Sequence, residues 1–238
     1  MFVLKVGGAG LFTVVMTTAV YYYCTLPLTG FPEPGKVTTI VMFVQFQRFM
    51  GRIYEFLGFG TSLDYRRKAG RKRRPPVDDP TLLVTDTAFD GVKVRVYQPR
   101  GQGQVKDGAG LVFMHGGGWI LPSVDFFDHV TRHIAKSTGA VVGSVDFWLA
   151  PEHMFPIPFI EDCLNATKYF LSHAGEFGVD PGRVGVAGDS TGGNLAAAVA
   201  LKLTQESSTN VCPLKLQALV YPALQHFDFQ TDSSVDKL

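Results

Sequence analysis

Short apolar runs alternate with longer amphipathic segments from residue 84 onward, and this alternation predicts the main fold. The segment TDTAFDGVKVRVYQP alternates with period two on either side of Asp90-Gly91, which predicts a β-hairpin. The runs GLVFMHG, GAVVGSVDF, RVGVAGDS and LQALVYPAL are typical of strands buried in a parallel sheet. Helices are predicted between these runs, near residues 123–138, 157–174 and 191–205. A hairpin followed by such units predicts an α/β fold with helices on both faces of a mostly parallel sheet.

The first part of the chain has a different pattern. No charged residue lies between Lys5 and Glu33, and the core of that interval, LFTVVMTTAVYYYCTLPL, is almost entirely apolar. This is close to the roughly 20 residues that a helix needs to cross a bilayer. The pattern predicts an uncleaved transmembrane signal anchor over residues 1–30, with a cleaved signal peptide as the alternative.

A helix and a linker are predicted over residues 31–80. In IVMFVQFQRFMGRIYEFLGFG the apolar residues recur at helical spacing, which predicts an amphipathic helix that either packs on the domain or forms a lipid-facing lid. Seven of the 22 basic residues then fall within residues 66–74, before Pro75-Pro76. This cluster fits a solvated linker or a contact with anionic lipid headgroups. The hydrolase-like domain is expected over residues 81–238.

Composition limits the remaining possibilities. The chain has 238 residues, 46% hydrophobic content and a formal net charge of +1, which suits one α/β domain with a substantial core. Outside the basic cluster acidic residues outnumber basic ones, so a nucleic-acid partner is not expected. Cys24, Cys163 and Cys212 lack metal-ligand spacing, so neither a zinc site nor a disulfide framework is predicted.

A strand-to-helix turn carries the strongest chemical signal. Gly188-Asp189-Ser190-Thr191-Gly192 fits the G-x-S-x-G pattern, in which a strained turn exposes a nucleophilic serine and glycine is needed on both sides. An apolar strand precedes the serine, and the helix-forming segment NLAAAVALKL follows it. The N-terminus of that helix directs N–H groups towards a developing oxyanion. Alone, the pattern also fits an ordinary tight turn, and less well a phosphate-binding loop.

A second stretch, LVFMHGGGWI, runs from an apolar strand into three glycines. Backbone N–H groups of close-packed glycines can hold an oxyanion without obstruction by side chains. Gly116 and Gly117 are therefore predicted to point their N–H groups at the spot that the N–H of Thr191 faces. Gly118 supports this loop, and His115 is predicted to brace it and not to act as the base.

HGGGW, DFWLAPEHMFP and GDSTGGN, in that order, resemble the hormone-sensitive-lipase group of α/β-hydrolases. With the N-terminal segment and YPALQ, the chain is most similar to the branch of microsomal arylacetamide deacetylases and neutral cholesterol ester hydrolases. The resemblance covers essentially the whole chain and implies that Ser190 is the nucleophile and that Gly116, Gly117 and Thr191 form the oxyanion hole. Thr191 stands where the family usually has alanine, and Trp148 replaces a common arginine.

The general base and its acid partner are expected downstream of the serine, in the order Ser, acid, His. The only histidine there is His226, with Asp228 two residues later. Both follow LQALVYPAL directly, before the strands whose ends should carry the pair. We therefore expect the chain to be the first part of a hydrolase, truncated after the sixth strand, with LQALV as an apolar edge that favours aggregation.

The sequence favours a membrane-anchored serine hydrolase that cleaves carboxylic esters, arylacetamides or lipid esters through an acyl-enzyme on Ser190. The alternative is an inactive hydrolase-fold protein that acts as an interaction or binding module. The expected partners are an ester substrate and a membrane, and the chemistry requires no metal or organic cofactor. The resemblance implies a single-pass type II protein of the endoplasmic reticulum with a lumenal domain, and the Asn165-Ala166-Thr167 sequon is compatible with that side.

Overall fold

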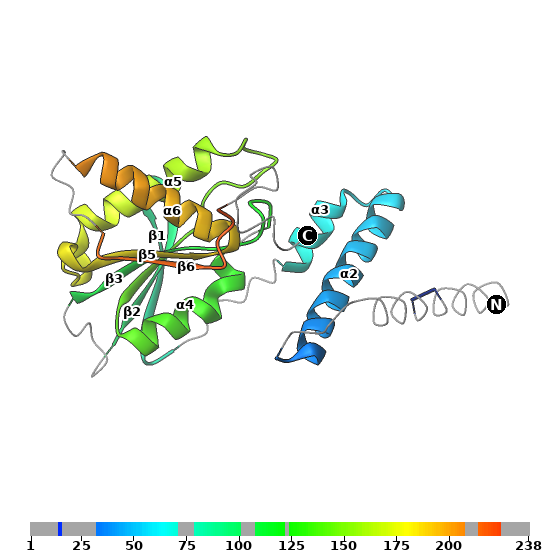
Figure 1. Cartoon of the computed structure of the whole chain (residues 1–238), viewed down its shortest axis with the longest axis horizontal. Coiled ribbons are helices and arrows are strands. Elements are labelled where there is room, and N and C mark those ends of the chain that lie inside the picture. Colours follow the sequence, from blue (N-terminus) through cyan, green and yellow to red (C-terminus); the bar gives the residue numbers. More distant parts are fainter. Residues whose placement is uncertain are drawn as a thin grey trace, which may run out of the picture. The chain divides into compact units, whose positions relative to one another are not determined.

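The computed structural model describes residues 14–15, 32–70, 79–100, 108–121, 124–207 and 214–224. The chain divides into two compact units, Met1–Ala69 and Gly70–Leu238 (Figure 1). The transmembrane segment predicted over residues 1–30 lies outside the described residues except for Val14 and Val15, and the Pro75-Pro76 linker also lies outside them. Within the described ranges, no helix combines the length and the apolar character that crossing a membrane requires.

The first unit contains the predicted amphipathic helix. Helix α2 (Pro34–Phe56) is followed by α3 (Ser62–Gly70). The start of α3 is fixed by a reciprocal pair of bonds, because the N–H of Thr61 donates to Asp64 Oδ2 (2.9 Å) and the N–H of Asp64 donates to Thr61 Oγ1 (3.0 Å). Several large apolar side chains of α2 are exposed, namely Ile40, Phe43, Val44, Phe46 and Phe56.

Six strands form one sheet in the second unit, in the order β1-β2-β4-β3-β5-β6. The strands are β1 (Leu82–Phe89), β2 (Val92–Pro99), β3 (Gly110–Met114), β4 (Val141–Val145), β5 (Val184–Asp189) and β6 (Leu216–Val220). The predicted hairpin is confirmed, since Asp90 and Gly91 have positive φ angles of 49° and 83° in the two-residue turn between β1 and β2. Strand β2 is antiparallel to both β1 and β4, and the pairs β3–β4, β3–β5 and β5–β6 are parallel.

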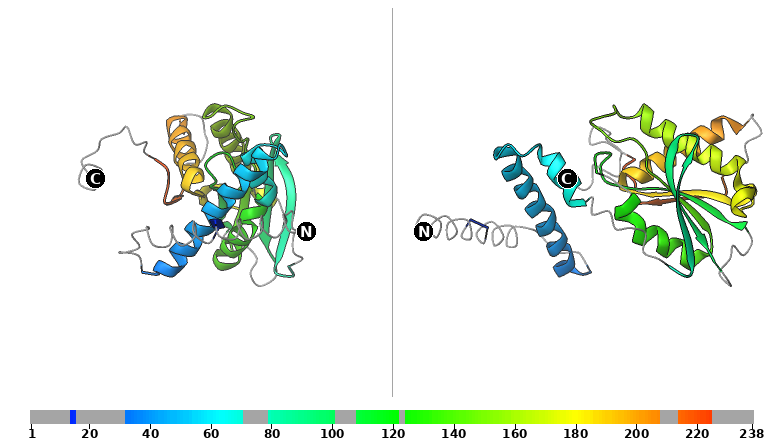
Figure 2. Two further views of the ribbon diagram at one scale, coloured as in Figure 1. Left: turned by 90° about the vertical axis from the view of Figure 1, so that its right-hand side faces the viewer. Right: turned by 180° about the vertical axis from the view of Figure 1, so that it is seen from behind.

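Helices cover both faces of this sheet, as the sequence predicted. Helices α5 (Ile157–Ser172) and α6 (Ser190–Gln205) lie over one face, and α4 (Val124–Thr138) lies over the other (Figures 1 and 2). Two short 3-10 helices, η3 (Ala174–Phe177) and η4 (Pro181–Arg183), lead from α5 into β5. The parallel strands β3, β4 and β5 therefore all end at the same edge of the sheet, where the loops before α4 and α6 begin.

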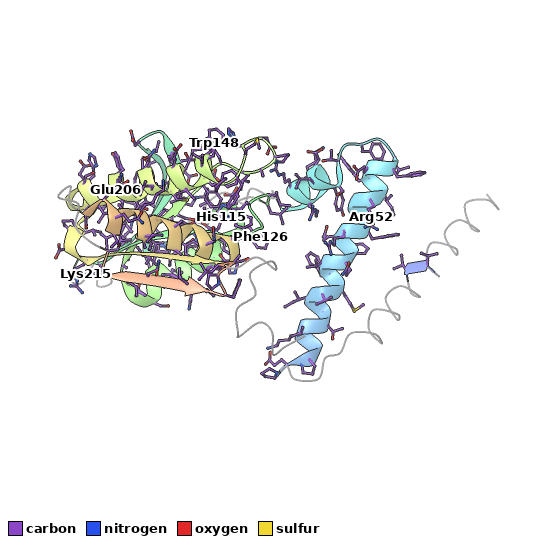
Figure 3. The ribbon with its side chains drawn as sticks, turned by 45° about the horizontal axis from the view of Figure 1, so that its top comes forward. Arg52, His115, Phe126, Trp148, Glu206 and Lys215 are labelled. Carbon is purple, nitrogen blue, oxygen red and sulfur yellow. The ribbon has the colours of Figure 1, made fainter. Side chains whose placement is uncertain are left out.

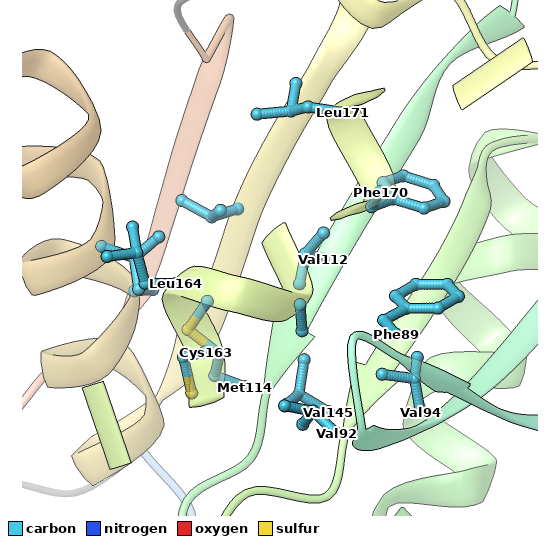
Figure 4. Close-up of a cluster of buried hydrophobic side chains, with 14 of the residues drawn as sticks. Phe89, Val92, Val94, Val112, Met114, Val145, Cys163, Leu164, Phe170 and Leu171 are labelled. Atoms are coloured by element: carbon cyan, nitrogen blue, oxygen red, sulfur yellow. The ribbon is translucent and has the colours of Figure 1, made fainter. Parts of the chain in front are cut away.

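Alternation along each strand separates two cores. Val112 and Met114 of β3 point towards α5 and α6, into the larger core drawn in Figure 4. The intervening Phe113 joins the smaller core on the other face, with Phe127 and Ala135 of α4. The apolar runs thus supply both faces of the sheet at once, which explains why they read as continuous hydrophobic stretches.

Buried charges join the hairpin to α4. Arg95 of β2 is 8% exposed and forms ion pairs with Asp86 of β1 (2.5 Å) and with Asp125 of α4 (2.9 Å). The hydroxyl of Tyr97 donates to Asp128 Oδ1 of α4 (2.9 Å). The Asp86 carboxylate and the other partners raise the pKa of Arg95, so the guanidinium stays charged and the network holds.

Strand β6 is an edge of the sheet among the described residues, as predicted for LQALV. Leu216 and Val220 at its two ends are 55% and 49% exposed. An edge with apolar side chains of this kind favours association with other strands.

Candidate active site

Ser190 occupies the junction between β5 and α6. Its φ angle is 51°, in the left-handed region that residues with a β-carbon rarely adopt. The side chains on either side of it are buried, with Asp189 8% and Thr191 5% exposed, while Ser190 itself is partly exposed. The fold therefore presents the hydroxyl of one serine at the edge of the sheet on a strained turn.

Close backbone packing explains the two glycines of this turn. A β-carbon added at Gly188 would lie 2.5 Å from the carbonyl carbon of Gly192 and 2.7 Å from the carbonyl oxygen of Met114. One added at Gly192 would lie 2.5 Å from the carbonyl oxygen of His115 and closer still to that of Met114. No side chain fits at either position, so the turn brings the start of α6 directly against the end of β3.

The glycine loop after β3 faces this turn. Gly117 and Gly118 have φ angles of 131° and 67°, in the positive region that favours glycine. At Gly117 an added β-carbon would also meet the carbonyl oxygen of Leu121 at 2.8 Å. The conformation at Gly117 is therefore open only to glycine.

Two of the three loop N–H groups are bound by the neighbours of Ser190. The N–H of Gly116 donates to Asp189 Oδ1 (2.8 Å), and the N–H of Gly118 donates to Thr191 Oγ1 (3.1 Å). The N–H of Gly117 makes no hydrogen bond to another described residue. The N–H of Gly116, expected to face the oxyanion, is therefore engaged by a carboxylate in this structure, whereas the N–H of Gly117 is not engaged by a described residue.

The N-terminus of α6 leaves its own N–H groups uncapped by a side chain. Asp189 is the N-cap residue but makes no capping hydrogen bond. Its carboxylate turns away to the glycine loop, and its second oxygen accepts a bond from the hydroxyl of Tyr221 (3.2 Å). The backbone N–H of Thr191 is consequently not occupied by a capping group and lies at the positive end of the helix dipole.

His115 is a buried brace for the loop. It is 1% exposed, and its ring stacks on Phe147 with centroids 4.5 Å apart. Its Nδ1 lies 2.8 Å from the carbonyl oxygen of Gly116. Burial lowers the pKa of this histidine, so the ring is neutral and Nδ1–H donates to Gly116. No hydrogen bond joins the ring to Ser190, which supports a bracing role over that of a base.

Sequence reasoning did not identify the segment after β6 as part of the site. The N–H of Ala223 donates to the carbonyl oxygen of Ser190 (2.9 Å), and Asn194 Nδ2 donates to the carbonyl oxygen of Ala223 (3.0 Å). Together with the bond from Tyr221 to Asp189, these contacts tie the segment to the nucleophile turn. The only signals in the sequence were the motif YPALQ and the asparagine that ends GDSTGGN.

Trp148 occupies the place of the arginine usual in similar sequences. Its backbone N–H donates to Asp162 Oδ2 (3.0 Å), and its ring lies 4.0 Å from that of His153. Trp148 is 54% exposed, and its neutral indole ring supplies no buried positive charge (Figure 3). Burial raises the pKa of Asp162, and the Trp148 N–H only partly opposes that shift.

The base is not found among the described residues. No hydrogen bond links Ser190 Oγ to any described histidine, and His226 and Asp228 lie outside the described ranges. Within those ranges, no group of three or more His, Cys, Asp or Glu side chains is arranged to bind a metal ion. The sequon residue Asn165 is exposed on α5, whereas Thr167 is fully buried.

Comparisons with known proteins agree with this geometry. A family model described as "alpha/beta hydrolase fold" matches residues 111–237. The chain is 39% identical over 218 residues to arylacetamide deacetylase of Bos taurus, covering 90% of this chain and 54% of that protein. It is 37% identical over 228 residues to neutral cholesterol ester hydrolase 1 of Rattus norvegicus, with the same coverage of each chain. The chain spans about half the length of these curated relatives.

Solved structures of esterases show the same fold. The hyperthermophilic esterase from Pyrobaculum calidifontis aligns with a TM-score of 0.61 at 38% identity, over 72% of this chain and 54% of that one. The thermostable carboxylesterase EstE1, cloned from a metagenomic library, aligns with a TM-score of 0.58 at 34% identity, over 73% and 58%. The fold and the relationship to esterases and lipases, both expected from the sequence, are thereby confirmed.

Proposed function

Because this chain belongs to the α/β-hydrolases, in the hormone-sensitive-lipase group, we propose that it carries the nucleophile and oxyanion hole of a serine hydrolase that cleaves carboxylic esters. One observation carries the proposal above the others. Ser190 lies on a strained strand-to-helix turn, and the backbone N–H groups of Gly117 and Thr191 beside it are not taken by side chains. That is the arrangement that acyl transfer to a serine requires.

The reaction proceeds in two halves. Ser190 Oγ attacks the ester carbonyl carbon, and its proton passes through a general base to the alkoxide oxygen, which leaves as the alcohol. The carbonyl oxygen becomes an oxyanion, which accepts hydrogen bonds from the N–H groups of Gly117 and Thr191. Water then attacks the acyl-enzyme, releasing the carboxylic acid and restoring the serine hydroxyl. The base is assigned to none of the described residues, because none of their histidines forms a hydrogen bond with Ser190.

Two kinds of substrate follow from the relatives. The relatives' names refer to arylacetamides and to cholesterol esters, both of which carry a bulky apolar group next to the scissile bond. Exposed apolar side chains occur on the first unit and also in the segment that follows β4, which includes Trp148, Met154 and Phe155. We propose lipid esters or arylacetamides as the substrate class on this basis.

Membrane anchoring and a lumenal domain remain part of the proposal. The support is the uncharged interval between Lys5 and Glu33 and the exposed position of Asn165 in a sequon. An N-glycan on Asn165 would place the domain in the endoplasmic reticulum lumen. The expected result is a gel shift after endoglycosidase treatment of the wild type that the Asn165→Gln variant lacks. A wild-type protein without any shift would contradict the lumenal placement.

Covalent labelling tests the catalytic proposal. The protein, in the form that its own cells make, is treated with a fluorophosphonate probe and compared with the Ser190→Ala variant. We expect labelling of the wild type and loss of at least ~95% of it in Ser190→Ala, because the probe bonds to the nucleophilic oxygen. Ser137→Ala, which removes an exposed hydroxyl on α4, is the matched control and keeps full labelling. Labelling that survives in Ser190→Ala would refute the proposal.

A further inference from the structure

We propose that the hydroxyl of Thr191 withholds the N–H of Gly118 from the oxyanion hole and so limits the rate of the reaction. The inference rests on the proposed function. The observation behind it is the hydrogen bond from Gly118 N–H to Thr191 Oγ1, 3.1 Å long, which joins two segments that are 73 residues apart in the chain.

The two neighbours of the nucleophile engage the two ends of the glycine loop. Asp189 accepts from the N–H of Gly116, and Thr191 accepts from the N–H of Gly118. Gly117, between them, is the only loop residue whose N–H makes no hydrogen bond within the described part of the chain. The oxyanion hole is therefore left with two backbone donors, from Gly117 and from Thr191 itself.

The two engaged N–H groups differ in what holds them. Gly116 is buried and donates to a carboxylate, and a charged acceptor gives the stronger kind of hydrogen bond. Gly118 is exposed and donates to a neutral hydroxyl. Of the two, the N–H of Gly118 is exposed and held by the weaker bond, so it is the one that could turn to an oxyanion once its acceptor is removed.

Burial makes the hydroxyl an effective competitor. Thr191 is 5% exposed, so water has little access to replace Gly118 as the partner of Oγ1. For the N–H of Gly118 to turn to the oxyanion, the buried hydroxyl would have to give up its hydrogen bond. The stabilisation of the oxyanion by this N–H is then largely offset by the loss at Thr191. With the hydroxyl removed, the same N–H would act as a third donor without that cost.

An anchoring role for the same bond makes the opposite prediction. If Thr191 mainly fixed the loop in place, removal of the hydroxyl would loosen the loop and lower the rate. The bond from Gly116 to Asp189, the ring of His115 on the Gly116 carbonyl and the steric restriction at Gly117 already fix the loop. These contacts are independent of Thr191 Oγ1, which is why we favour competition over anchoring.

A pair of variants isolates the hydroxyl. Thr191→Ser removes only the methyl group, and Thr191→Ala removes both the methyl group and the hydroxyl. The protein as its own cells make it is assayed with p-nitrophenyl butyrate for kcat and KM, together with Ser190→Ala. We expect Thr191→Ala to raise kcat about three- to tenfold with KM within about twofold, because the added donor acts on the transition state. Thr191→Ser keeps the hydroxyl that accepts from Gly118, so its kcat should stay below that of Thr191→Ala.

Each result has a definite meaning. A kcat of Thr191→Ala at or below that of Thr191→Ser, with Ser190→Ala inactive, overturns the inference and leaves the proposed function standing. Turnover that persists in Ser190→Ala overturns the proposed function itself. If thermal unfolding shows that Thr191→Ala is not folded, Thr191→Val replaces it. Valine keeps the volume of threonine without the hydroxyl, and the same rise in kcat is expected.

Discussion

The nucleophile turn over residues 188–192 and the glycine loop over residues 116–118 meet at one site but are held by different forces. The turn is fixed by contact between backbone atoms, because no β-carbon fits at Gly188 or Gly192. The loop is fixed mainly through Gly116, whose N–H donates to Asp189 and whose carbonyl oxygen binds His115, and the Gly118 N–H additionally donates to Thr191. Steric contact admits one conformation, whereas a hydrogen bond can be strengthened or released by a single side chain. The turn therefore sets where the serine lies, and the loop sets how many donors face it.

The largest effect is expected at Gly192. The change Gly192→Ala forces a β-carbon to within 2.5 Å of the His115 carbonyl oxygen and closer to that of Met114. Backbone atoms on both sides leave no flexible group to move, so we expect a loss of at least about 3 kcal/mol in the free energy of unfolding. Urea denaturation followed by circular dichroism measures this change. A loss below about 1 kcal/mol would show that the turn is not held by steric contact.

An intermediate effect is expected at Asp189. The change Asp189→Ala leaves the buried N–H of Gly116 without an acceptor, which costs about 1–3 kcal/mol of stability. The loop should also lose its alignment, so the rate of fluorophosphonate labelling should fall by about tenfold or more. Asp189→Asn is the matched control because it keeps an oxygen for Gly116, and it should retain most of both properties. Equal losses in the two variants would show that the charge matters more than the acceptor.

A pH-dependent effect is expected at His115. Burial holds the pKa of the folded histidine below its ordinary value of 6.5, so the unfolded chain binds the proton more readily. The contribution of this residue to stability is therefore complete above about pH 6.5 and declines as the pH falls below that value. Thermal midpoints measured from about pH 8 to pH 5 should fall more in the wild type than in His115→Asn, which does not titrate. Parallel profiles would contradict this assignment.

The smallest effect is expected at Gly118. Its φ angle of 67° is strained for alanine, yet the nearest atom to an added β-carbon, Ile120 Cγ1, is 3.8 Å away. Gly118→Ala should therefore cost only the conformational strain, about 1–2 kcal/mol, well below the loss at Gly192. The same urea titration compares the two variants. Equal losses would mean that the loop is as tightly packed as the turn.

The order of strands and helices was predictable because it depends on local patterns. The predicted positions are close to the observed ones for the turn at Asp90-Gly91, for the strands and for the helices between them. Period two and helical spacing arise from the geometry of each element, and they are readable wherever one face is buried. The turn at Ser190 was also readable, since its glycines, its strand and its helix are adjacent in the chain.

The hydrogen bonds of the glycine loop depend on contacts between distant segments. Which glycine keeps its N–H available depends on side chains 73 residues away, at Asp189 and Thr191. A pattern of three glycines carries no information about such partners, so the sequence alone did not indicate that the N–H of Gly116 donates to Asp189. The contact between Tyr221 and Asp189 was hidden for the same reason.

The sequence by itself determined the α/β-hydrolase order of elements and the strand-to-helix turn at Ser190, because steric limits on backbone turns and the burial of apolar faces act over a few residues. The tertiary structure alone decided which N–H groups of the glycine loop are bound by the neighbours of that serine. Parallel strands bring β3 and β5 side by side from distant parts of the chain, and only then can Asp189 and Thr191 reach the loop.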